Sequence, residues 1–214
     1  MHKTLISISG LASNVGKTKL VCDLLQQHSG WEAIKVSRGH RRSCGKSPQA
    51  CCISPMLGDE PRILSGRAET FAQGKDTGRY WHSGASNVHW VICTGEQVEE
   101  GIKIALDRVQ AEGVFVEGTS ILKYISVDYA IMVSDPLVSD IKSSAVGVMG
   151  KVDAVFVSGD EPPESFSQEF RNRLLRRGAK LGDASFYFER DFDLLVDDIR
   201  KIHAARFHDG EVGQ

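Results

Sequence analysis

A glycine-rich segment near the start of the sequence limits the folds that this chain can adopt more than any other feature. Residues 10–18 read Gly-Leu-Ala-Ser-Asn-Val-Gly-Lys-Thr, which satisfies the pattern G-x-x-x-x-G-K-[ST]. Residues 3–9 precede this turn as a predicted strand, and residues 17–27 follow it with helical periodicity. Strand, turn and helix in this order predict a phosphate-binding loop, because the helix dipole and its free N–H groups favour an anion.

Each residue type in the loop has a chemical task. Consecutive backbone N–H groups wrap the phosphates, Lys17 contacts the β- and γ-phosphates, and the Thr18 hydroxyl ligates Mg²⁺. A glycine-rich turn that binds nothing is the alternative interpretation. The expected nucleotide-binding residues are Gly10, Ser13, Asn14, Val15, Gly16, Lys17, Thr18 and Lys19.

A second acidic group is expected beside the loop, because Mg²⁺ prefers a few carboxylates together with water and phosphate oxygens. Residues 114–118 read Val-Phe-Val-Glu-Gly, which puts Glu117 at the tip of an apolar strand and lets the chain turn at Gly118. We expect Glu117 to be a Mg²⁺ ligand and, with Lys17, a catalytic residue. Carboxylates also end strands for ordinary solubility, so a plain surface position is the alternative.

Short apolar runs alternate with helical patterns along the chain. Runs typical of strands buried on both faces lie at residues 5–9, 33–37, 88–93, 114–117, 129–133, 154–158 and 185–189, and amphipathic stretches lie at 17–27, 96–111, 165–177 and 192–207. This alternation predicts an α/β fold of the P-loop NTPase kind, with a mostly parallel sheet and helices on both faces. Ligands then bind at the carboxyl ends of the strands.

A chain of 214 residues, 41% of them hydrophobic, is long enough for one substantial core. We expect a single nucleotide-binding domain over residues 1–208, with an inserted loop segment after the second strand at 39–74 and a disordered tail at 209–214. The inserted segment shows no sustained period and is rich in glycine, proline, serine and charged residues. Loops this long are uncommon inside compact domains and tend to be functional or mobile.

Charge and cysteine content exclude several classes of protein. The net charge of -2 and the pI near 6.4 provide no broad basic field, so no nucleic-acid partner is expected. Neither a signal-peptide pattern nor a membrane anchor is visible, so we expect a cytoplasmic protein with no membrane partner.

The five cysteines, an odd number, argue against a disulfide scaffold. Cys22 and Cys93 lie in apolar patterns and are expected to be small buried hydrophobes.

Three segments of the chain carry a resemblance to a known family. The first is the loop itself. The second reads Gly-Lys-Asp-Thr-Gly-Arg-Tyr at residues 74–80, followed by Ser-Gly-Ala at 83–85, and the third reads Phe-Val-Glu-Gly at 115–118. Together they resemble the molybdopterin-guanine dinucleotide biosynthesis protein B family, small P-loop proteins related to dethiobiotin synthetase and to the amidotransferases of cobalamin synthesis. Residues 33–35 are similar to that family's second strand.

The resemblance implies binding and slow hydrolysis of GTP, in an accessory role in attaching a guanine nucleotide to molybdopterin. It implies a pterin cofactor precursor as the small anionic partner, and a homodimer. No Asn-Lys-x-Asp motif follows residues 154–158, so the sequence does not decide between GTP and ATP. No glutamine or arginine finger is evident, which also predicts slow hydrolysis.

Soft metal ligands gather in the inserted segment. His40, Cys44, Cys51 and Cys52 fall within thirteen residues, and Zn²⁺ or iron bound to them would order the loop. Their spacing contains no C-x-x-C pair. We therefore favour an arrangement in which residues 50–53 tuck one or both adjacent cysteines under the loop as small hydrophobes.

Basic residues near the carboxyl end of the second strand predict a second anion site. They would face the nucleotide crevice, where a phosphorylated or carboxylated substrate docks, and a helix beginning near residue 75 would add further groups. Surface arginines that only solvate a loop are the alternative. The expected substrate-binding residues are Arg38, Lys75, Asp76 and Arg79, with Arg41, Arg42 and Lys46 beside Arg38.

Two classes of function fit these features. One is a nucleotide-driven enzyme or accessory protein acting on a small anionic substrate, and it includes ATP-dependent ligases of the dethiobiotin synthetase type. The other is a regulatory or metallochaperone-like NTPase whose nucleotide state switches residues 39–74. They differ in whether the inserted loop binds a cofactor precursor or a metal ion.

Overall fold

The computed structural model describes residues 3–39, 53–136, 141–159 and 165–208. Within these residues the strands are β1 (Thr4–Gly10), β2 (Glu32–Arg38), β3 (Arg62–Ser65), β4 (Val88–Cys93), β5 (Gly113–Glu117), β6 (Tyr129–Ser134), β7 (Ala154–Val157) and β8 (Ser185–Phe188). The α-helices are α1 (Lys17–Gln27), α2 (Arg67–Thr70), α3 (Asp76–His82), α4 (Val98–Arg108), α5 (Ser143–Val146), α6 (Phe166–Arg176) and α7 (Phe192–His208). Short 3₁₀ turns are η2 (Ser54–Met56), η3 (Thr119–Lys123), η4 (Met149–Lys151) and η5 (Glu189–Asp191).

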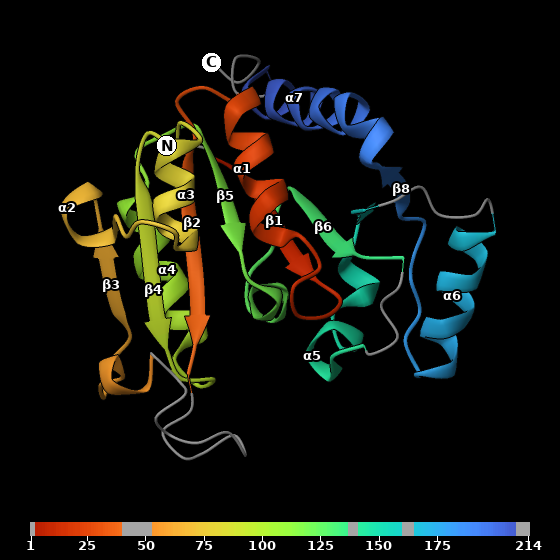
Figure 1. Cartoon of the computed structure of the whole chain (residues 1–214), viewed down its shortest axis with the longest axis horizontal. Helices are drawn as coiled ribbons and strands as arrows, with labels where there is room; N and C mark the ends of the chain where they lie inside the picture. The colour runs from red at the N-terminus through yellow and green to blue at the C-terminus, as the bar shows by residue number, and fades with distance from the viewer. Residues whose placement is uncertain (1–2, 40–52, 137–140, 160–164, 209–214) are drawn as a thin grey trace.

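In the described part of the chain, the strands form one eight-stranded sheet in the order β3-β4-β2-β5-β1-β6-β7-β8 (Figure 1). All neighbours pair in parallel except β3, which is antiparallel to β4. The chain leaves β1 through α1 to reach β2 on one side, and later passes from β5 to β6 on the other side of β1. Such a reversal of strand order opens a crevice at the carboxyl ends of the central strands.

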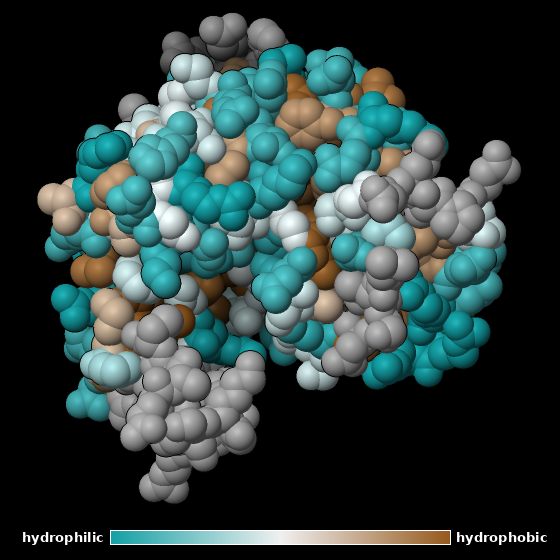
Figure 2. All heavy atoms as spheres, viewed as in Figure 1, coloured by the Kyte–Doolittle hydropathy of each residue, from teal (hydrophilic) through white to brown (hydrophobic). Residues whose placement is uncertain are grey.

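Helices cover both faces of the sheet. Leu20 of α1, Tyr80 of α3 and Leu195 of α7 share one buried apolar cluster, on the face turned toward the viewer in Figure 1. Ile102 of α4 and Phe170 of α6 belong to the cluster on the opposite face. Hydrophilic side chains cover most of the face seen in Figure 2, with apolar side chains between them in small groups. The predicted α/β fold with a mostly parallel sheet is therefore confirmed.

The inserted segment differs from the expectation of a loop without regular structure. Its described part, residues 53–74, contains η2, β3 and α2. β3 is only four residues long, lies between Pro61 and Gly66, and has partly or fully exposed side chains, so it shows no hydrophobic period. Its extended form comes from pairing with β4, where Leu64 lies opposite Trp90. A strand this short is defined by its partner and not by its own sequence.

The cysteines and the C-terminal tail lie partly outside the described ranges. His40, Cys44, Cys51 and Cys52 lie outside the described residues, as does the tail at 209–214. Cys22 and Cys93 are free and buried, as expected. No helix among the described residues combines the length and apolar character needed to cross a membrane.

The start of β5 is held beneath an aromatic side chain. The ring of Trp31 packs on Phe115 with 4.7 Å between the ring centroids. The indole approaches Gly113 so closely that a Cβ atom at this position would lie 2.1 Å from Trp31 Cε2. Gly113 is also the register partner of Thr4 on β1, so the strand cannot move away without disturbing the ladder. Glycine is required here by the close approach of the ring.

We expect Gly113→Ala to lower the free energy of unfolding by about 1–3 kcal/mol, because the added methyl group must displace either the indole or the strand. Chemical denaturation measures this change. Gly182→Ala is the matched control, since no atom lies within 4 Å of a Cβ built there. It should change stability by no more than about 0.5 kcal/mol. Equal effects of the two substitutions would contradict the proposed packing constraint.

Candidate phosphate-binding site

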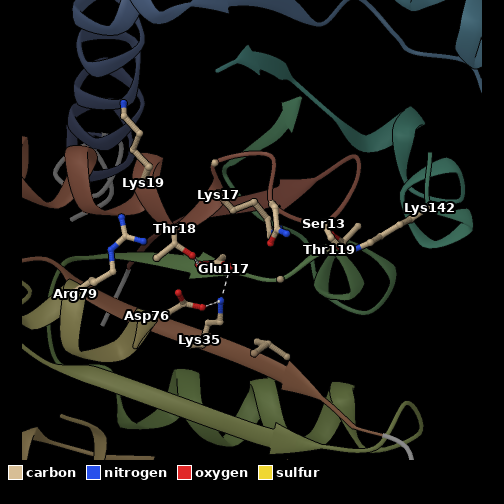
Figure 3. Close-up of a pocket in the computed structure, with 14 residues that line it drawn as sticks. Ser13, Lys17, Thr18, Lys19, Lys35, Asp76, Arg79, Glu117, Thr119 and Lys142 are labelled. Carbon is tan, nitrogen blue, oxygen red and sulfur yellow. Dashed lines mark hydrogen bonds and ion pairs between the residues drawn. The ribbon is translucent and has the colours of Figure 1, made fainter. Parts of the chain in front are cut away.

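An open cavity of about 520 Å³ lies at the carboxyl ends of β1, β2 and β5, where the sheet topology predicts a ligand crevice. The loop between β1 and α1 forms one wall, and the first turn of α3 and the flank of α5 form others (Figure 3). Five lining side chains are basic and two are acidic, so the cavity favours anions. The lining residues are Ser13, Asn14, Gly16, Lys17, Thr18, Lys19, Lys35, Val36, Asp76, Arg79, Glu117, Gly118, Thr119 and Lys142.

The loop has the backbone geometry of an anion-binding nest. Asn14 and Gly16 have φ angles of 59° and 90°, in the left-handed region that asparagine and glycine tolerate best. Ser158 supports the turn from below, because its hydroxyl donates to the carbonyl oxygen of Val15 at 2.8 Å. A Cβ at position 16 would lie 3.0 Å from Ser158 Oγ. Both the positive φ and this close support therefore require Gly16.

Lys17 lies back across the start of the loop. A Cβ at position 10 would lie 2.7 Å from Lys17 Cδ and 2.9 Å from its Nζ, so Gly10 leaves the space that the side chain needs. Burial lowers the pKa of Lys17; the charge of Glu117 opposes this effect, and the ammonium groups of Lys142 and Lys35 reinforce it. Within the described part of the chain, no hydrogen bond or ion pair holds the Lys17 ammonium. This cation is thus positioned for a counter-ion that the described residues do not supply.

Glu117 is buried at the end of β5, with 3% of its surface exposed. Its Oε2 accepts a hydrogen bond from Thr18 Oγ1 at 2.9 Å and another from the Tyr80 hydroxyl. Its Oε1 accepts from Lys35 Nζ at 2.5 Å. A buried carboxylate is costly unless donors compensate for lost water, and here three donors from three elements do so. The predicted position beside the loop is correct, but the group is not surface-exposed.

Lys35 connects Glu117 to a second carboxylate. Its Nζ lies 2.6 Å from Oδ2 of Asp76, the first residue of α3. Burial acts to raise the pKa of Asp76, but the hydrogen bond and charge of Lys35, the nearby Thr18 hydroxyl and the charge of Arg79 outweigh it and lower the pKa below the usual value. Both carboxylates therefore contact one ammonium group, as the dashed lines in Figure 3 indicate.

The predicted loop residues occupy different positions around the cavity. Six of them line it, whereas Gly10 lies beneath Lys17 and Val15 is buried. Lys19 lines the cavity but pairs with Asp23 at 2.9 Å and with Glu189 at 3.1 Å. Its ammonium is therefore already bound to two carboxylates.

The predicted substrate-binding residues divide into two pairs. Asp76 and Arg79 line the cavity. Arg38 and Lys75 are exposed, the first at the end of β2 and the second just before α3, and neither is among the described residues that line the cavity. The described residues do not include Arg41, Arg42 and Lys46, so the role expected for them stays a prediction.

Four polar residues of the site were not predicted: Lys35, Tyr80, Thr119 and Lys142. Lys35 had a usable signal, because a charge within an apolar parallel strand needs a buried partner. Burial and the charge of Glu117 raise the pKa of Tyr80 well above its usual value, so its hydroxyl keeps the proton it donates. Lys142 had no sequence signal. Its backbone N–H donates to the carbonyl oxygen of Leu11 at 3.0 Å, which joins this distant segment to the loop.

No transition-metal centre is found in the described residues, where no group of three or more His, Cys, Asp or Glu side chains could hold a metal. The zinc or iron site expected from His40, Cys44, Cys51 and Cys52 stays a prediction, since these residues lie outside the described ranges.

The fold is similar to those of several solved structures. A crystal structure of HypB from Helicobacter pylori in complex with nickel matches with a TM-score of 0.56 and 13% identity, over 99% of this chain and 91% of that chain. Weaker similarities include LpxK from Aquifex aeolicus in complex with ATP (TM-score 0.43, 16% identity, 88% of this chain and 71% of that chain). Another is the Zn(II)-bound YjiA GTPase from E. coli (TM-score 0.43, 13% identity, 87% and 57%). No family model matches the sequence, and no curated protein matches it.

Tyr80→Phe removes one donor from the buried Glu117 and leaves the ring in place. We expect the free energy of unfolding to fall by about 1.5–3 kcal/mol, the range for hydrogen bonds to charged groups. Urea denaturation measures the change. Tyr129→Phe is the control, because among the described residues the Tyr129 hydroxyl is hydrogen-bonded to the neutral hydroxyl of Tyr187, at 3.4 Å, and not to a carboxylate. If Tyr80→Phe proves no more destabilising than Tyr129→Phe, the hydrogen bond to Glu117 contributes no more to the free energy of unfolding than one between neutral groups.

Proposed function

We propose that this chain binds a nucleoside triphosphate together with Mg²⁺ at residues 10–18 and hydrolyses it slowly. The observation that carries the proposal is Lys17, whose partly buried ammonium lies over Gly10 and has no ion-pair partner in the described part of the chain. A triphosphate in the loop would supply the missing negative charge. Because an anion favours the charged form of lysine, binding would also oppose the effect of burial on the pKa of Lys17.

The residues beside the loop fit Mg²⁺. Thr18, Asp76 and Glu117 offer hydroxyl and carboxylate oxygens, the ligand types that this ion prefers. A cation is already seated between the two carboxylates, in the form of the Lys35 ammonium. We therefore assign Asp76 to the metal side of the site, beside Thr18 and Glu117. An ion held there would neutralise charge on the β- and γ-phosphates.

The side chains of the cavity bind and orient the triphosphate. The loop N–H groups and Lys17 hold the phosphates, while Arg79 and Lys142 add positive charge from other walls. Among the described lining residues there is no glutamine to orient water, and both carboxylates are engaged by other side chains. Hydrolysis is therefore slow unless a partner protein supplies a water-orienting group or an arginine.

For the biological role we propose an accessory function in molybdopterin guanine dinucleotide synthesis, with GTP as the nucleotide and a homodimer as the working form. A pterin cofactor precursor would be the small anionic substrate. The support is the resemblance at residues 74–80 and 115–118, since Asp76 and Glu117 from these two segments both line the cavity. The excess of basic over acidic lining side chains suits a second phosphate-bearing molecule.

Two alternatives use the same loop. An ATP-dependent ligase of the dethiobiotin synthetase type would place a carboxylate substrate beside the triphosphate. A regulatory or metallochaperone-like NTPase would bind metal through His40, Cys44, Cys51 and Cys52. The second alternative is kept because HypB, which has a similar fold, is in complex with nickel.

Lys17→Ala should weaken binding of Mg²⁺-GTP or Mg²⁺-ATP by about 1.5–3 kcal/mol, roughly 10- to 150-fold in Kd, because a charged donor to the phosphates is lost. Isothermal titration calorimetry measures both affinities. Lys103→Ala, at a surface lysine that is 61% exposed and pairs with Glu99 on α4, should bind as wild type does. Equal nucleotide affinities for wild type and Lys17→Ala would contradict the proposal.

Native mass spectrometry of the purified protein should identify the second ligand. Our proposal expects a guanine nucleotide and a phosphorylated pterin to copurify, with no stoichiometric metal other than magnesium. An adenine nucleotide with a carboxylated amine would favour the ligase. One equivalent of zinc, iron or nickel per chain would favour the metallochaperone-like NTPase.

A further inference from the structure

The position of Lys35 sets it apart from the other basic residues of the cavity. Its ammonium lies 2.5 Å from Glu117 Oε1 and 2.6 Å from Asp76 Oδ2, and its side chain is only 15% exposed. Lys35 and Glu117 are register partners on adjacent parallel strands, so their side chains leave the same face of the sheet. Lys35 is thus a cation held between both acidic side chains of the cavity (Figure 3).

The proposed Mg²⁺ would need the same carboxylates. Thr18 donates to Glu117 Oε2 at 2.9 Å, and Thr18 and Asp76 both line the cavity beside that carboxylate. A metal ion bound to Thr18 would therefore share both carboxylates with the Lys35 ammonium. An ammonium and a divalent ion in contact with the same oxygens repel each other strongly, above all in a partly buried site. The cage formed by Thr18, Asp76 and Glu117 accommodates one of these cations at a time.

We propose that Lys35 is a positioning residue that occupies the Mg²⁺ position until nucleotide arrives, an inference that rests on the proposed function. In the nucleotide-free protein its ammonium keeps Asp76 and Glu117 together and excludes Mg²⁺. A triphosphate brings negative charge into the cavity that Lys35 lines. The ammonium would then turn to phosphate oxygens, and Asp76 and Glu117 would be free to hold the metal ion. Mg²⁺ therefore enters with the nucleotide and does not precede it.

A second lysine of the cavity provides the control. Lys19 also lines the cavity, but its ammonium pairs with Asp23 and Glu189 instead of the cage. Lys19→Met changes the net charge by the same amount as Lys35→Met and leaves Asp76 and Glu117 with Lys35 between them. An effect confined to Lys35→Met therefore reports direct occupation of the cage, not the general potential of the cavity.

The test measures Mg²⁺ binding in the absence of nucleotide, by calorimetry and by thermal unfolding after treatment with a chelator. Wild type and Lys19→Met should show no stabilisation at millimolar Mg²⁺. Lys35→Met should unfold at a lower temperature in chelator, because Asp76 and Glu117 then repel each other. It should also bind Mg²⁺ roughly tenfold more tightly than wild type, or better, and regain stability as it does so.

Lys35→Gln covers the case in which Lys35→Met does not fold, because the amide still donates to one carboxylate. The same gain in Mg²⁺ affinity is expected. A parallel titration of wild type with Mg²⁺ and GTP or ATP separates the two proposals: failure to bind nucleotide would overturn the proposed function. If nucleotide binds but wild type, Lys35→Met and Lys35→Gln have the same Mg²⁺ affinity without it, the exchange of Lys35 for metal is wrong.

Discussion

The carboxylate of Glu117 is the group on which the arrangement of this site depends. It accepts hydrogen bonds from Thr18 at the start of α1, from Lys35 on β2 and from Tyr80 in α3. Since a buried carboxylate is stable only while its donors are present, these elements must keep their relative positions together. One side chain at the tip of β5 thus aligns the loop, the neighbouring strand and the helix that carries Asp76.

The charge of the cavity follows from this arrangement. Lys35 balances part of the charge of the two carboxylates from within, so the remaining lysines and Arg79 give the cavity its excess of positive charge. Lys17 is the cation best placed to bind a phosphate, because it lies over the loop and lacks a protein counter-ion in the described residues. The acidic groups of the site therefore have a cationic partner within the protein, whereas Lys17 is available for an anionic ligand.

Much of the fold could be predicted because its strands are buried on both faces. The apolar runs at residues 5–9 and 114–117 correspond to β1 and β5, and the helix expected at 17–27 begins at Lys17 as predicted. β3 could not be predicted, because a short edge strand with exposed side chains carries little hydrophobic signal of its own. In the site, Thr18 and Glu117 were expected to lie together, and their hydrogen bond joins residues far apart in the chain.

The sequence by itself determined the turn at residues 10–18 and its place between a strand and a helix, because its glycine spacing, its lysine and its threonine all lie within one local segment. It also determined the acidic strand tip, since a carboxylate after a buried run must emerge at the sheet edge. Only the tertiary structure decided which side chains hold that carboxylate. Strand register set Lys35 beside Glu117, and helix packing directed Tyr80 to the same oxygen as Thr18. These contacts join elements from distant parts of the chain, and no local pattern of residues specifies which distant donor a buried carboxylate will meet.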